Sequence, residues 1–187
     1  MTFDKLADRC LLFVDTEKNL LIELLKEAEI EMSRKCNIHE ASESYSDNGD
    51  GAYSLPSEYK QIIHISYNGD RLVPITEDEV DYDNDNNVQD GTPTGYFVQN
   101  NRIHTNYKGS GGSLKITFYA TIYNQGASPI VPDMYHRDLC DYAIAIASAK
   151  KLPELHAKHW GMWMSNLESI KNEDADRELV HSIKEII

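Results

Sequence analysis

Four oxygen-bearing side chains alternate along one acidic segment, as the ligands of a calcium-binding loop do: Asp81, Asp83, Asp85 and Asn87. An EF-hand loop also requires glycine at its sixth position and a bidentate glutamate at its twelfth. The chain has Asn86 and Thr92 at these places, so the EF-hand pattern fails. We interpret residues 81–90 as a solvated acidic loop, and the sequence leaves open whether it binds a divalent ion.

Histidine and cysteine side chains with the spacing of metal ligands occur in the C-terminal part of the chain. His156 and His159 fall close together on one predicted helix, and His136 and Cys140 fall one turn apart on the preceding one. Zinc sites use such spacings, but the HExxH motif is absent. We interpret these residues as helix-packing or surface positions and predict no metal site.

A glycine-rich segment at residues 108–113 is the remaining candidate for binding chemistry. Its sequence, Lys-Gly-Ser-Gly-Gly-Ser, lacks the GKS or GKT ending of a phosphate-binding loop. It precedes a predicted strand, whereas phosphate sites use the N-terminus of a helix. No serine lies in a GxSxG motif. Because no acid, base and nucleophile can be assembled, we predict that the protein is not an enzyme and has no catalytic residues and no cofactor.

Aromatic and methionine side chains gather near the C-terminus on a predicted helix that is apolar on more than one face. Such a helix is buried on more than one side, which in a chain of this size suggests a subunit or partner interface. Burial in the core is the simpler alternative. The candidate interface residues are Trp160, Met162, Trp163 and Met164, with Tyr135 and Tyr142 on the preceding helix.

The composition excludes several classes of partner. The chain has 187 residues, of which 18 are basic and 31 acidic, a net charge of −13. Such a chain repels nucleic acid phosphates and anionic membranes. No apolar run approaches the roughly 20 residues that span a bilayer, and the first residues do not form a signal peptide. We expect a soluble protein made in a cytoplasm, with Cys10, Cys36 and Cys140 as reduced thiols.

The elements that position these residues are helices at both ends of the chain. Asp15-Thr16-Glu17 predicts the cap of a helix that runs to Lys35, with an apolar stripe at Leu21, Leu24, Leu25, Ala28 and Met32. Residues 1–41 form an N-terminal helical segment. Residues 132–187 form three C-terminal helices that pack with it: one ends near Leu152, a second follows Pro153, and a last one spans residues 174–187.

Between the helices, period-two patterns predict a small antiparallel β domain over residues 52–124. Asn68-Gly69 predicts a hairpin between strands 62–67 and 71–75, and residues 76–80 a capped helical turn. A second hairpin joins 96–98 to 102–105, and the strand 114–123 alternates most clearly. Residues 42–51, 81–95 and 108–113 are predicted loops. The predicted fold class is α+β, a helical bundle with an inserted antiparallel β domain.

The order of four segments resembles the head-to-tail connector proteins of tailed bacteriophages, also called adaptor, gatekeeper or tail tubular proteins. The segments are the amphipathic helix 20–32, the phrase Leu55-Pro-Ser-Glu-Tyr59 with the strand and Asn68-Gly-Asp-Arg-Leu72 turn that follow, Gly91-Thr-Pro-Thr-Gly-Tyr-Phe97 with the strand 115–120, and the alanine-rich helix from Tyr135. The likeness spans roughly residues 5–165. The glycine-serine connection at 109–113 and the helix after Ile170 depart from it.

The resemblance implies a structural virion protein at the neck of the particle. Such a protein forms a ring of twelve copies below the portal protein, extends the DNA channel, retains the packaged genome and docks a tail or further neck protein. DNA would pass an acidic channel without specific binding. Two alternatives stay open: another neck or tail-completion protein, or a small carbohydrate- or ligand-binding β module that uses Tyr67, Tyr96, Tyr107, Tyr119 and Tyr123.

Overall fold

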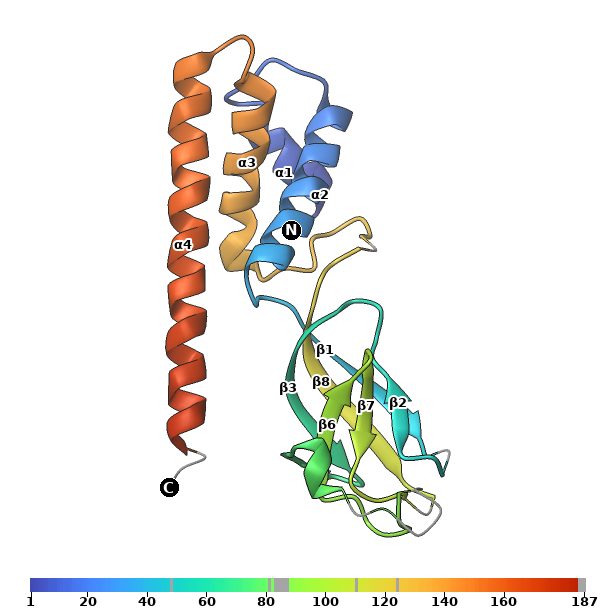
Figure 1. Cartoon of the computed structure of the whole chain (residues 1–187). Helices are drawn as coiled ribbons and strands as arrows, with labels where there is room; N and C mark the ends of the chain where they lie inside the picture. Colours follow the sequence, from blue (N-terminus) through green and yellow to red (C-terminus); the bar gives the residue numbers. More distant parts are fainter. Residues whose placement is uncertain (48, 81, 83–87, 110, 124, 185–187) are drawn as a thin grey trace. The chain divides into compact units, whose positions relative to one another are not determined.

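The computed structural model describes residues 1–47, 49–80, 82, 88–109, 111–123 and 125–184, with side chains up to residue 173 (Figure 1). The chain divides into two compact units. Residues 1–39 and 121–187 form the helical unit, and residues 40–120 form the β unit. The combination of four α-helices with two small sheets confirms the predicted α+β class.

The helical unit contains α1 (Phe3–Cys10), α2 (Lys18–Lys35), α3 (His136–Ser148) and α4 (Pro153–Lys184), with the 3-10 turn η2 (Asp133–Tyr135) before α3. In α1, apolar residues three and four apart form one buried stripe: Phe3, Leu6, Ala7 and Cys10. The stripe predicted for α2 is confirmed, because all five of its residues are buried. The cap lies within the predicted segment, since Glu17 is the N-cap residue and α2 begins at Lys18, but Glu17 makes no side-chain cap hydrogen bond and the first turn contains no acidic residue.

The last two predicted helices are one. α4 continues from Pro153 to Lys184 without a break at residue 174 (Figure 1). The segment after Ile170 contains no glycine or proline and is rich in residues with good helix propensity, so nothing in it ends the helix. The predicted inward positions Leu179, Val180, Ile183 and Ile186 lie outside the part of the chain whose side chains are described.

A buried glutamate holds the segment that leads into α3. Glu29 of α2 is fully buried, and its Oε1 accepts the backbone N–H groups of Ile130 and Val131. Its Oε2 accepts the side-chain amide of Gln125 at 2.8 Å. Since a buried carboxylate is costly unless it is hydrogen-bonded, these three donors explain how Glu29 is tolerated, and they fix the course of residues 125–131 against α2.

The β unit contains two four-stranded sheets with the orders β1-β8-β3-β4 and β2-β7-β6-β5. The strands are β1 (Glu40–Ser46), β2 (Ala52–Ser54), β3 (Tyr59–Tyr67), β4 (Asp70–Arg71), β5 (Val73–Pro74), β6 (Gly95–Gln99), β7 (Arg102–Thr105) and β8 (Ser113–Ala120). The face predicted for β8 is confirmed, since Leu114, Ile116, Phe118 and Ala120 are all buried. The hairpin of β6 with β7 is also confirmed.

Three predictions for the β unit are corrected. Residues 42–46 are not a loop but most of β1, an edge strand that pairs in regular register with β8. The predicted strand 71–75 divides into β4, which forms the hairpin with β3, and β5, which belongs to the other sheet. β5 pairs with β6 in parallel, so the unit is not wholly antiparallel. Between β5 and β6, the capped turn is confirmed as η1 (Glu77–Glu79).

The glycines of the connection before β8 lie against a tyrosine ring. Tyr67 is buried and donates its hydroxyl hydrogen to Asp47 Oδ2 at 2.8 Å. A Cβ added at Gly109 or Gly112 would clash with the Tyr67 ring. Gly111 has φ +85° and donates its N–H to the same carboxylate oxygen. Close approach and a left-handed backbone therefore account for the glycine-rich sequence of this connection.

Candidate interaction surface

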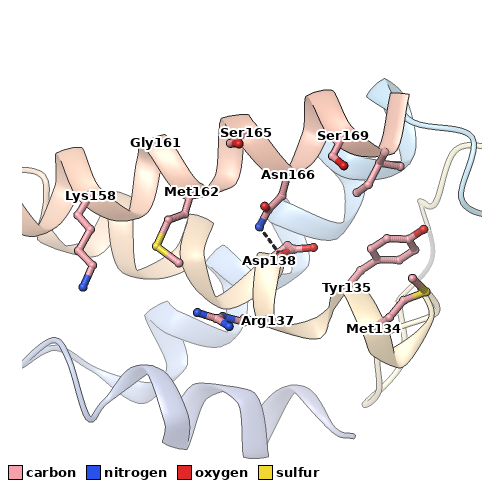
Figure 2. A pocket seen from close by; sticks show the side chains of 11 residues that line it. Met134, Tyr135, Arg137, Asp138, Lys158, Gly161, Met162, Ser165, Asn166 and Ser169 are labelled. Atoms are coloured by element: carbon pink, nitrogen blue, oxygen red, sulfur yellow. Dashed lines mark hydrogen bonds between the residues drawn. The ribbon is translucent and has the colours of Figure 1, made fainter. Parts of the chain in front are cut away.

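A hollow lies within the helical unit, along α3 and α4. It has a volume of about 660 Å³ and runs from Met134 and Tyr135 of η2 to Lys158 and Met162 on α4 (Figure 2). A second hollow of about 280 Å³ continues it toward α1 and is lined by Arg9 and Phe13. Arg137, Lys158 and Met162 line both hollows. We call the two together the cationic groove.

The helical period explains why these α4 residues share one side. Lys158, Met162 and Asn166 are four residues apart and therefore lie one turn above another. Leu155, His159, Trp163, Leu167 and Ile170 form the neighbouring stripe, and most of them are buried. Figure 2 shows that Lys158 and Met162 extend from α4 toward the region that Arg137 of α3 reaches. The groove is thus one flank of the α3–α4 contact.

The three cations of the groove are exposed and make no ion pair among the described residues: Arg9, Arg137 and Lys158. By contrast, Lys18 pairs with Asp4 and Asp8, and Lys26 pairs with Glu23. Exposed ion pairs contribute little to stability. The difference between the two groups of cations therefore concerns whether they are free to bind a partner. Unpaired cations beside apolar side chains suit a partner surface that is acidic and apolar.

Two aspartates lie at the base of the groove. Asp138 accepts a hydrogen bond from the side-chain amide of Asn166 at 2.6 Å (Figure 2). Burial raises the pKa of Asp138 above its ordinary value, although the Asn166 hydrogen bond acts in the opposite direction. Asp141 accepts a hydrogen bond from Nδ1 of His159 at 2.7 Å, and both side chains are buried. The Phe13 ring contacts His159 edge-on, with 5.7 Å between centroids.

The buried pair Asp141–His159 leaves polar atoms without partners. Asp141 Oδ2 and His159 Nε2 have no hydrogen-bond partner in the described structure, and neither has Nε1 of Trp163. A carboxylate bound to Nδ1 orients an imidazole in the way that serine hydrolases use. No described serine, threonine or cysteine hydroxyl or thiol is hydrogen-bonded to His159 Nε2. The pair therefore joins α3 to α4 through a buried hydrogen bond.

Beneath the groove, two thiols lie together in the core. Cys10 and Cys140 are both buried and free, as is Cys36. The hydrogen bond between the Cys140 and Cys10 side chains, together with burial, raises the pKa of Cys10. These cysteines therefore act as small apolar core residues.

The predicted interface residues other than Met164 fall in two places. Tyr135 and Met162 line the groove. Tyr142, Trp160 and Trp163 form an aromatic cluster, with centroids 6.1 Å apart for Tyr142 with Trp160 and 5.1 Å for Tyr142 with Trp163.

Burial separates these residues further. Trp163 is fully buried, and Tyr142 is buried and donates to Glu27 Oε1 at 2.9 Å. Met164 is 39% exposed. Of the predicted set, Met162, Met164 and Trp160 therefore keep surface that a partner could cover.

The histidines whose spacing resembles that of metal ligands have other partners. His156 Nδ1 lies 2.9 Å from the Ala145 carbonyl oxygen, and His136 Nε2 lies 3.2 Å from that of Val131. His159 binds Asp141, as described above. Among the residues that the structure describes, no group of three or more histidine, cysteine or acidic side chains is placed to hold a metal ion. Asp81, Asp83, Asp85 and Asn87 lie outside those residues.

The tyrosines proposed for ligand binding do not form a common exposed face. Tyr67 is buried, whereas Tyr96, Tyr107 and Tyr119 are half-buried. Tyr123 is 54% exposed but belongs to the helical unit. Within the described ranges, no helix is both long and apolar enough to cross a bilayer.

The sequence reasoning missed Arg137, Lys158, Asp138 and Asn166. The available clue was the four-residue spacing of Lys158, Met162 and Asn166, which places a cation and a methionine on one flank of a helix. No curated protein matches the chain. A family profile described as SU10 adaptor protein matches residues 1–182. The chain belongs to this phage head-to-tail adaptor family, which confirms the resemblance noted from the sequence and indicates a structural role at the neck of the virion.

Proposed function

We propose that this member of the SU10 adaptor family forms a closed ring of twelve copies below the portal protein, where it extends the DNA channel and docks the next neck or tail protein. The observation that carries the proposal is the family match over residues 1–182, nearly the whole chain. The protein is made in the cytoplasm of the host bacterium and joins the virion during assembly.

The character of the cationic groove supports a protein partner. Small-molecule sites are concave and enclose most of their ligand, with a few convergent polar groups. The groove instead extends over residues of η2, α3 and α4 and to Phe13, and two of its apolar lining residues are largely exposed: Met134 is 70% and Phe13 54% exposed. Protein interfaces combine apolar and aromatic side chains with arginine in this way. The cationic groove is therefore better suited to a protein partner than to a small ligand.

The charge of the chain supports passage of DNA without specific binding. The β unit carries 13 acidic and five basic residues, and the helical unit 18 acidic and 13 basic ones. Both units are thus negatively charged, by −8 and −5. DNA binding requires clustered cations that displace counterions from phosphates. Repeated around a ring, this charge would repel the duplex from the wall of the channel.

Light scattering of the purified chain, alone and with purified portal rings, tests the proposal. The expected result is a monomer in dilute solution that joins the portal as a ring. A chain that stays monomeric when portal rings are present would contradict the proposed function. Gel-shift titration with duplex DNA at low salt tests the channel argument. Tight, salt-sensitive binding would contradict passive passage.

A further inference from the structure

The β unit presents an acidic surface that complements the cationic groove. This surface includes η1, where Glu77, Asp78 and Glu79 follow one another and all three are exposed. We call these three residues the acidic turn. Three adjacent carboxylates match the number of unpaired cations in the groove, which are Arg9, Arg137 and Lys158.

Hydrogen bonds hold the acidic turn in one conformation. The Glu79 carboxylate accepts the backbone N–H of Thr76 at 2.7 Å and its hydroxyl at 3.1 Å. These two hydrogen bonds lower the pKa of Glu79. The side-chain amide of Gln99 donates to Glu77 Oε2 at 3.0 Å. A turn that is already ordered loses little conformational entropy when it binds.

Apolar side chains accompany the charges on both surfaces. Beside the acidic turn, Val73 is 62% and Val98 45% exposed. The adjoining hollow, of about 430 Å³, is lined by Pro74, Phe97 and Val98 together with Glu77. Phe13, which lines the groove, is 54% exposed, and its neighbour in sequence, Leu12, is 81% exposed. Each surface therefore joins exposed apolar area to charge of one sign, and the two signs are opposite.

We infer that the cationic groove of one copy binds the acidic turn and its apolar surroundings on a second copy of this chain. Because the two surfaces differ, the contact is heterologous, and contacts of this kind generate rings when the rotation closes. The inference rests on the proposed ring and names the surfaces by which neighbouring copies recognise each other. Association in this way covers apolar area that is exposed on the single chain.

The composition of the groove favours an acidic protein surface over nucleic acid. Asp138 and Asp141 line it together with its cations, and Met162 and Phe13 are among its apolar lining residues. Phosphate-binding surfaces are much more positively charged than this. A protein surface that offers both carboxylates and apolar side chains matches both components of the groove.

A charge-swap experiment tests the inference. The groove variant carries Arg137→Glu and Lys158→Glu, and the turn variant carries Glu77→Lys and Asp78→Lys, which leaves the Glu79 cap intact. Sedimentation velocity at high protein concentration and low salt measures association. We expect each variant alone to associate at least about tenfold more weakly than the wild type, and an equimolar mixture of the two to regain association.

A control variant, Lys35→Glu with Lys150→Glu, makes the same change of charge in the helical unit outside the groove, and it should associate as the wild type does. Circular dichroism confirms that each variant is folded. The inference is overturned if the wild type shows no association, if the groove variant associates normally, or if the mixture does not recover. Binding of duplex DNA by the wild type that the groove variant loses would also overturn it, in favour of nucleic acid.

The failure of this inference and the failure of the proposed function are distinguishable. If the groove variant still joins portal rings in the light-scattering experiment, neighbouring copies use other surfaces and the proposed function stands. If the wild type does not join portal rings, the proposed function fails whatever the charge-swap mixture shows.

Discussion

Different kinds of interaction stabilise the helical unit and the β unit. The helical unit buries large apolar side chains from all four helices in one cluster that includes Trp163, Leu21 and Leu25. The β unit has a smaller cluster around Ile65, Leu114 and Ile116, and its connections depend on hydrogen bonds and glycines. Apolar packing therefore contributes most of the stability of the helical unit, whereas backbone geometry and polar contacts contribute more to the stability of the β unit.

The largest effect is expected at the centre of the helical cluster. Trp163→Ala removes a fully buried indole and should lower the free energy of unfolding by about 3–5 kcal/mol, because the cavity cannot collapse completely. Chemical denaturation followed by circular dichroism at helical wavelengths measures this. The matched control is Trp160→Ala, a half-buried residue on the same helix, which should cost clearly less. Equal losses would contradict the role of packing at Trp163.

Glu29 is a charged side chain that is buried within the helical unit. Glu29→Ala removes the acceptor of three hydrogen bonds, from Ile130, Val131 and Gln125. Donors left unsatisfied in the interior cost about 1–3 kcal/mol, which thermal denaturation can detect. Glu23→Ala, which breaks only the exposed pair with Lys26, is the control and should change stability by less than about 0.5 kcal/mol. If the two variants were equally stable, Glu29 would not anchor this segment.

The glycine-rich connection before β8 tests how far backbone geometry stabilises the β unit. Gly112→Val places a branched side chain against the Tyr67 ring, and the overpacking should cost about 1–3 kcal/mol. Near-ultraviolet circular dichroism, which reports on tyrosines, should show the change. Gly126→Ala is the control, because a Cβ there meets nothing within 4 Å. A neutral Gly112→Val would show that Tyr67 can move away without loss.

The smallest effects concern pH and have opposite signs in the two units. Burial tends to raise the pKa of Asp47 in the β unit, but hydrogen bonds from Gly49, Tyr67, Tyr53 and Gly111 outweigh it and lower the pKa. The stability that Asp47 contributes is therefore present above its unfolded pKa and is lost as pH falls through its folded pKa.

Asp138 in the helical unit behaves in the reverse way. Because burial raises its pKa, it lowers stability as pH rises from the unfolded value through the folded one. Asp138→Asn should therefore stabilise the chain at neutral pH, whereas Asp47→Asn should destabilise it. Denaturation of both variants at neutral and acid pH measures this. If both substitutions changed the free energy of unfolding in the same direction at neutral pH, the opposite pKa shifts of Asp47 and Asp138 would be contradicted.

Each unit was predicted in part from the sequence. The stripe of α2 and the alternation of β8 were predicted because burial on one face leaves a periodic pattern. The strand β1 was missed because its residues are mostly polar and exposed at a sheet edge, and its pairing with β8 is set by tertiary structure. The length of α4 was underestimated because Asp174 resembles a cap within a sequence that favours helix throughout.

Of the residues that line the cationic groove, Tyr135 and Met162 were predicted from the sequence as interface residues. Trp163 and Tyr142 stood out as large aromatic residues, and the structure buries both. Arg137 and Lys158 did not stand out, because exposed cations are common on helices. Their proximity depends on how α3 packs against α4, which the sequence of neither helix specifies alone.

Electron cryo-microscopy of the chain mixed with purified portal rings would test whether the chain forms the proposed ring. We expect a closed ring of copies of this chain on the portal, with an open channel along its axis. In that ring, the cationic groove of each copy should contact the acidic turn of the next. Portal rings that bind no copies of the chain, or bind it as scattered single copies, would show that the chain does not form this ring.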